Sequence, residues 1–153
     1  MKIYVASSWR NERQPEIVEL LREMKHEVYD FRHPMEGDNG FHWSNIDQEW
    51  QKWTPTQFIQ ALNHPIATAG YALDWNAMCW ADTGVLVMPC GRSAHLEAGF
   101  FVGANKPLFI LLSEGEPELM YNMATVVCAT EDELVKHIAI RNTQMGMTVI
   151  GGM

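Results

Sequence analysis

The chain has 153 residues, a hydrophobic fraction of 47% and a formal net charge of −8 at pH 7. This length suits one domain with an ordinary buried core, and the hydrophobic fraction argues against a disordered chain. The negative charge argues against binding to a nucleic acid polymer or an anionic membrane, because such binding needs clustered lysine and arginine. We therefore expect a small-molecule ligand or a protein partner.

Strand and helix patterns alternate along the chain. The expected strands are Lys2 to Ala6, Glu27 to Phe31, Gly84 to Met88, Leu108 to Leu112 and Thr125 to Ala129. The expected helices are Gln14 to Lys25, Ile66 to Ala81, Ala94 to Ala104 and Glu131 to Arg141, the last capped by Thr130. Such alternation predicts a single-domain α/β fold, flavodoxin-like or Rossmann-like, with a parallel sheet of about five strands and helices on both faces.

Two segments depart from this alternation. Residues 33–65 are rich in glycine, asparagine, proline and aromatic residues and are too long for a simple connection, so they predict an insertion in a domain of residues 1–142. Short helices are expected within it at Ile46 to Trp53 and Pro55 to Leu62. Residues 143–153 contain three glycines and predict a flexible tail.

The start of the chain lacks the long apolar core of a signal peptide, and no run approaches the roughly 18 apolar residues of a membrane span. The three cysteines are widely spaced without a CxxC motif, and the histidines lack paired ligand spacing. These features predict a cytoplasmic protein with no metal and no organic cofactor.

The most informative stretch joins the strand ending at Met88 to the helix that follows. Pro89 and Gly91 break the apolar run, and Glu97 lies in the first turns of the next helical pattern. In open α/β sheets, ligands bind outside the carboxyl ends of the strands, where helix N-termini favour anions. Glu97 is therefore a candidate reactive carboxylate, although a glutamate there often only stabilises the helix dipole.

Three segments together resemble the nucleoside 2-deoxyribosyltransferase-like family, which includes the deoxynucleoside 5′-monophosphate N-glycosidases. They are residues 2–6 (KIYVA), 74–82 (DWNAMCWAD) and 93–107 (SAHLEAGFFVGANKP). Their order and spacing span most of the chain, and the aromatic segment between the first two has no counterpart. The resemblance implies a Rossmann-like enzyme of nucleotide metabolism.

The resemblance also implies particular roles. Glu97 attacks the anomeric carbon of a nucleoside or nucleotide, Tyr4 orients it, and Asp74 assists the leaving base or grips the sugar. The covalent sugar ester then passes to water in a hydrolase or to a second base in a transferase. From the residues alone, Tyr4 is equally compatible with packing under the sheet and Asp74 with a solvated helix position.

One departure from the family bears on the substrate. Transferases that act on free nucleosides carry an aspartate six residues before the nucleophile, where this chain has Gly91. The monophosphate hydrolases have a small serine-containing loop there, which accepts the 5′-phosphate. The residues that suit such a phosphate cradle are Gly91, Arg92, Ser93, Ser7, Ser8 and Arg10.

The remaining candidates are an aromatic ring and an amide. Trp43 either stacks on a nucleobase or belongs to a buried aromatic stripe. Residues 121–123 match a place where the family reaches into a neighbouring active site, which makes Asn122 a substrate-binding candidate and implies a homo-oligomer, dimer or higher. His95 is expected to be structural, and Cys90 is a weak candidate for a reactive thiol.

Two other functions fit the same pattern. A non-catalytic module would bind or sequester a nucleotide in the same crevice without turnover. An N-glycosidase acting on a larger nucleotide such as NAD would use the room that the insertion of residues 33–65 provides.

Overall fold

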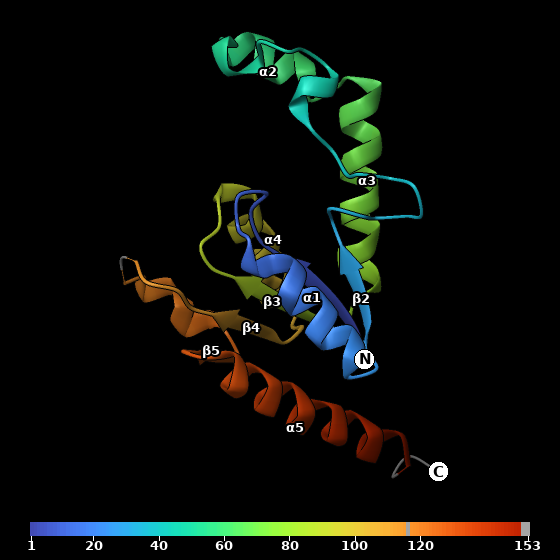
Figure 1. Ribbon diagram of the computed structural model, residues 1–153, viewed down its shortest axis with the longest axis vertical. Coiled ribbons are helices and arrows are strands. Elements are labelled where there is room, and N and C mark those ends of the chain that lie inside the picture. Colours follow the sequence, from blue (N-terminus) through green and yellow to red (C-terminus); the bar gives the residue numbers. More distant parts are fainter. Residues whose placement is uncertain (116, 151–153) are drawn as a thin grey trace. The chain divides into compact units, whose positions relative to one another are not determined.

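The computed structural model describes residues 1–115 and 117–150, and of residues 146–150 only the backbone. Five parallel strands form one sheet in the order β2-β1-β3-β4-β5 (Figure 1). This is the flavodoxin-like order. After β1 the chain adds β2 on one side and then returns to add β3, β4 and β5 on the other side, so the strand order reverses between β1 and β3. The fold class predicted from the sequence is confirmed.

The strands are β1 (Lys2–Ala6), β2 (Glu27–Asp30), β3 (Thr83–Val87), β4 (Leu108–Leu111) and β5 (Val126–Cys128). The α-helices are α1 (Arg13–Glu23), α2 (Pro55–Ala61), α3 (Pro65–Trp80), α4 (Arg92–Gly103) and α5 (Glu131–Ile150). Three short 3-10 helices are η1 (Trp43–Asn45), η2 (Trp50–Lys52) and η3 (Leu119–Met123). No helix in the described part of the chain has the length and hydrophobicity required to cross a membrane.

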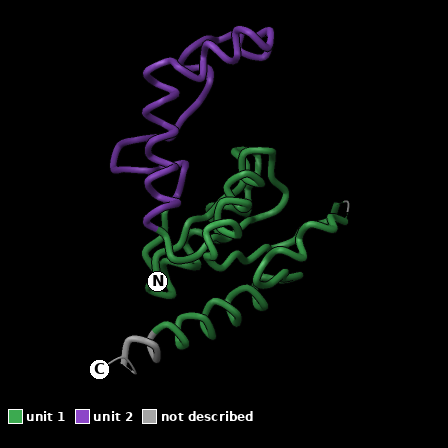
Figure 2. The backbone as a smooth tube through the Cα atoms, turned by 180° about the vertical axis from the view of Figure 1, so that it is seen from behind, with its two compact units in different colours: residues 1–29, 81–153 green, residues 30–80 purple. Residues whose placement is uncertain are grey.

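The chain divides into two compact units (Figure 2). Unit 1 contains residues 1–29 and 81–153, and unit 2 contains residues 30–80. Unit 2 therefore includes the insertion predicted at residues 33–65 and also α3, which the sequence pattern assigned to the sheet domain.

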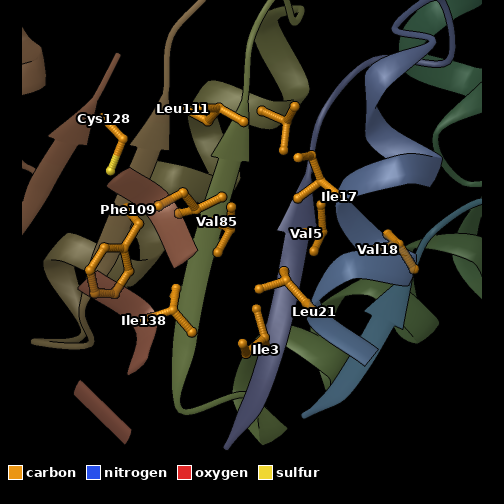
Figure 3. Close-up of a cluster of buried hydrophobic side chains, with 12 residues drawn as sticks. Ile3, Val5, Ile17, Val18, Leu21, Val85, Phe109, Leu111, Cys128 and Ile138 are labelled. Carbon is orange, nitrogen blue, oxygen red and sulfur yellow. The ribbon is translucent and has the colours of Figure 1, made fainter. Parts of the chain in front are cut away.

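Alternate residues of the central strands face opposite sides of the sheet, as strand geometry requires. One side packs against α1 and α5 in an aliphatic core (Figure 3). This core contains Ile3, Val5, Val85, Val87, Phe109 and Leu111 from the strands, Ile17, Val18 and Leu21 from α1, and Leu134 and Ile138 from α5. The alternate positions point to the other face, where Phe101 of α4 covers Gly84.

The end of the chain is more regular than its sequence predicts. The Glu133 N–H donates to Thr130 Oγ1 at 3.2 Å, and the Glu133 carboxylate accepts from the Ala129 N–H at 2.7 Å, so the predicted cap on α5 is confirmed. The helix continues to Ile150, so residues 143–150 are helical where a flexible tail was expected. Glutamine and methionine are good helix formers, and they offset Gly146. Residues 151–153 of the predicted tail lie outside the described residues.

Unit 2 is organised around Trp43. Its ring makes edge contacts with Phe41, Trp53 and Phe58, at centroid distances of 4.7, 5.6 and 5.6 Å. The helix expected at Ile46 to Trp53 does not form, and only the short 3-10 helix η2 lies within that range. Asp47 explains the change, because its carboxylate accepts the Glu49 N–H at 2.9 Å and the Trp53 indole N–H at 2.6 Å, in competition with helical backbone bonds.

Candidate active site

The carboxyl ends of β1 and β3 lie side by side where the strand order reverses, and side chains clamp their loops together. Ser7 Oγ donates to the Val87 carbonyl oxygen at 2.8 Å. The buried Asn11 amide donates to the same carbonyl at 3.1 Å and to Ser7 Oγ at 3.0 Å. The loop after β1 is therefore fastened to the last residue of β3, at the place where this fold class binds ligands.

The loop after β3 leads into an open helix N-terminus. Gly91 is the N-cap residue of α4, so no side chain at that position accepts a hydrogen bond from the first turn. Arg92 and Ser93 follow and are exposed. First-turn N–H groups without a capping side chain are suited to binding an anion, and the arginine adds a positive charge. Gly91, Arg92 and Ser93 therefore lie together at the start of α4, and their role in holding a phosphate stays a prediction.

The other predicted cradle residues behave differently. The Ser7 hydroxyl donates its single proton to the Val87 carbonyl. Ser7 therefore holds the two loops together and has no proton left to donate to a phosphate. The Ser8 hydroxyl accepts the Arg10 N–H at 3.2 Å, which shapes the loop after β1. Arg10 itself is exposed.

Glu97 lies in the second turn of α4 and is half-buried. Its neighbours Ala94 and Ala98 are buried, as is Phe101 one turn further on. Burial and the negative charge of Glu97 raise the pKa of the Cys90 thiol to about 11. The Glu97 carboxylate therefore acts electrostatically on the end of the loop after β3.

Tyr4 lies on the same face of the sheet as α4. Its fully buried ring stacks on Tyr29 at 5.3 Å and leans against Phe101 at 5.8 Å. Tyr4 pairs in register with Gly84, and a Cβ on that glycine would lie 2.7 Å from the Phe101 ring. The absence of a side chain at position 84 lets α4 approach the sheet, and Phe101 links Tyr4 to the helix that carries Glu97.

The remaining predicted residues belong to α3, η1 and η3. Asp74, on α3, is half-buried and belongs to unit 2, as does Trp43. The contacts of Trp43 with three other rings favour the structural interpretation of that residue. Asn122 is exposed on η3, and its amide donates to the Leu119 carbonyl at 3.0 Å.

A cluster around His95 was missed by the sequence analysis. His95 Nδ1 lies 2.9 Å from the Gly91 carbonyl oxygen, and His95 Nε2 lies 3.0 Å from the Tyr121 hydroxyl. Because the carbonyl can only accept, Nδ1 carries a proton, and in the neutral ring Nε2 accepts the Tyr121 proton. His95 therefore fixes the N-cap residue of α4 to η3. The i, i+4 spacing from Gly91 was available in the sequence, but the contact with Tyr121 spans 26 residues.

The cluster also gives Cys90 a histidine neighbour. Cys90 Sγ lies 3.6 Å from His95 Nδ1 and 3.3 Å from Met88 Sδ. A pKa near 11 keeps this thiol protonated at neutral pH, which argues against the reactive-thiol hypothesis. Among the side chains that the structure describes, no three His, Cys, Asp or Glu residues converge as a metal-ligand set.

Comparison of the chain with models of known protein families and with curated protein sequences finds no match.

Proposed function

We propose that this protein cleaves the N-glycosidic bond of a nucleotide or nucleoside, with Glu97 as the nucleophile. The observation that carries the proposal is the half-buried Glu97 carboxylate on α4, the helix that follows β3, whose carboxyl end is fastened to the loop after β1 by Ser7 and Asn11. The three-segment resemblance described above motivates the choice of bond.

The chemistry follows two displacements at C1′ of the sugar. A Glu97 carboxylate oxygen bonds to C1′ as the bond from C1′ to the base nitrogen breaks, and the base leaves with that electron pair and takes up a proton. Water then attacks C1′, releasing free sugar and regenerating the carboxylate, or a second base attacks and gives an exchanged product. Partial burial favours this role, because a carboxylate with few water contacts interacts more strongly with developing oxocarbenium charge.

A 5′-monophosphate is the preferred substrate form in this proposal. The N-terminus of α4 offers uncapped N–H groups at Arg92 and Ser93, together with the arginine guanidinium. These groups lie one turn before Glu97 on the same helix. Tyr4 as the orienting residue and Asp74 as the residue assisting the base remain predictions of the resemblance.

The test is a screen for free base released from deoxynucleosides, their 5′-monophosphates and NAD, followed by chromatography. Glu97→Gln removes the nucleophilic charge and keeps the shape of the side chain, so release should fall by at least about 10³-fold. Glu16→Gln is the matched control, since Glu16 is an exposed glutamate in the first turn of α1 and should leave the rate unchanged.

Each outcome separates the competing functions. Release that survives Glu97→Gln contradicts the proposal. Saturable nucleotide binding with no release by the wild-type protein indicates the sequestering module instead. Release of base from NAD but from no monophosphate indicates an N-glycosidase that acts on larger nucleotides. Base exchange in the presence of a second free base identifies a transferase.

A further inference from the structure

A cavity of about 320 Å³ lies within unit 1, between α4 and η3. Its floor is the face of the sheet that α4 covers, formed by Leu86, Leu108 and Ile110, which are almost fully buried. Gly99 and Val102 of α4 form one wall. Ligand pockets in proteins typically begin at about 300 Å³ and have mostly apolar walls, so both the size and the lining suit a small molecule.

This cavity is separate from the candidate active site. His95, Gly99 and Val102 all line it and are spaced i, i+4 and i+7, so they share one flank of α4. Glu97 is not among the lining residues. It follows His95 by two residues, which is about 200° around a helix, and therefore lies on the opposite flank.

The polar side chains at the rim offer an occupant hydrogen-bond acceptors, because the Nδ1 proton of His95 is already donated to the Gly91 carbonyl. The Tyr121 hydroxyl lies 3.0 Å from His95 Nε2, which accepts its proton when the His95 ring is neutral, and 3.4 Å from Met88 Sδ, a second acceptor for the same proton. In either case, the hydroxyl oxygen keeps a lone pair that can accept a hydrogen bond from an occupant. Glu118 contributes a carboxylate, of which Oε1 already accepts the Met120 N–H at 3.1 Å. None of the described residues that line the cavity is a lysine or an arginine. Because this lining has acceptors and no cationic side chain, it disfavours phosphates and carboxylates. It favours a neutral molecule that donates a hydrogen bond.

We propose that the cavity is a binding site for a small, neutral, bicyclic heteroaromatic molecule with a ring N–H. A cavity of about 150 Å³ holds one benzene ring, so 320 Å³ has room for two fused rings. The hydrocarbon edge lies on the floor of Leu86 and Ile110, and the N–H points to the rim at Tyr121 or Glu118. His95 lines the cavity and also makes the hydrogen bond to the Gly91 carbonyl at the start of α4. An occupant of the cavity therefore contacts a residue that positions this helix N-terminus.

Indole and benzofuran test the proposal, because they have nearly the same shape and differ in the ring N–H. Isothermal titration of the full chain should show saturable binding of indole, about three- to tenfold tighter than benzofuran, as expected for one neutral hydrogen bond. Glu97→Gln should leave indole affinity unchanged, because the binding site does not include Glu97. No saturable indole binding, or equal affinity for the two probes, overturns the proposal.

Two glycines on α4 provide a matched pair for locating the site. A Cβ at Gly99 or at Gly103 meets no other atom within 4 Å, but only Gly99 lines the cavity. Gly99→Leu should fill the cavity and weaken indole binding at least about tenfold, whereas Gly103→Leu should bind as the wild type does. Equal binding by both variants places the indole elsewhere and overturns the assignment.

A third variant tests the rim without altering the cavity volume. Tyr121→Phe removes the accepting oxygen and keeps the ring, so the preference for indole over benzofuran should shrink toward one. A preference that persists through Tyr121→Phe and through Glu118→Gln contradicts the proposed orientation of the N–H. Both substitutions lie at half-buried or exposed positions, where folding tolerates them.

Discussion

Unit 1 and unit 2 bury different kinds of side chain. Unit 1 packs branched aliphatic residues from five strands and two helices, and many of them are completely inaccessible to water. Unit 2 relies on the edge contacts that three rings make with Trp43, which is itself only half-buried. Ile59 and Tyr71 of the same unit remain more than half exposed. The interlocked sheet gives unit 1 many redundant contacts, whereas unit 2 depends on a few.

The largest effect should come from truncating one packed ring in each unit, a fully buried ring in unit 1 and a half-buried one in unit 2. Phe109→Ala in unit 1 removes a side chain that is 2% exposed and should cost about 3–5 kcal/mol of the free energy of unfolding. Trp43→Ala in unit 2 should cost less and should raise amide exchange in residues 30–80 only. Denaturant unfolding and hydrogen exchange measure the two effects.

Leu96→Ala is the control for these truncations, because Leu96 is 80% exposed and its loss should change stability by less than about 0.5 kcal/mol. If Trp43→Ala raises exchange equally throughout unit 1, the two units unfold as one and the contrast between them is wrong.

A smaller effect should come from adding one methyl group to a glycine in each unit. The Cβ of Gly84→Ala would lie 2.7 Å from the Phe101 ring, which is 1% exposed and has no room to move, so the cost should be about 1–3 kcal/mol. In Gly70→Ala the Cβ would lie 2.9 Å from Phe41 Cβ. Phe41 is only half-buried, and alanine favours the helix by roughly 1 kcal/mol, so the net change should be smaller. Equal losses in thermal unfolding would mean that unit 2 is packed as tightly as unit 1.

The smallest effect concerns pH and should be confined to unit 1. Burial, together with the positive charge of the chain's N-terminus, lowers the pKa of His26 below its ordinary 6.5. The unfolded chain therefore takes up this proton at a higher pH than the folded chain, so the free energy of unfolding should decrease as the pH falls below about 6.5. His26→Gln should flatten this part of the stability profile, as measured by denaturant unfolding at a series of pH values.

The sequence predicted what local patterns determine. Apolar runs located all five strands to within a residue or two, and Thr130 with Glu133 located the start of α5. The extent of α5 was missed because three glycines suggested a tail, although only Gly146 falls within the helix. The role of Asp47 was missed because the apolar pattern of residues 46–53 favoured a helix. The hydrogen bond from the Trp53 indole to the Asp47 carboxylate competes with that helix and cannot be read from the pattern.

In the candidate site, the sequence predicted the loop that leads into α4. It did not predict the side-chain hydrogen bonds that hold this part of the site together. Gly91 and Glu97 follow from the break between a strand pattern and a helix pattern. The clamp of Ser7 and Asn11 on Val87 joins residues about eighty positions apart, and no local pattern records such a contact. The same is true of His95 with Tyr121 and of the cavity that they border.

The protected thiol of Cys90 has a practical consequence. None of the three cysteines is in a disulfide, Cys128 is buried, and Cys90 stays protonated well above neutral pH, whereas Cys79 is exposed on α3. A maleimide dye at pH 7 should therefore attach at Cys79 without any engineering of the chain. That gives unit 2 a single fluorescent reporter, whose signal can be followed as nucleotide is added.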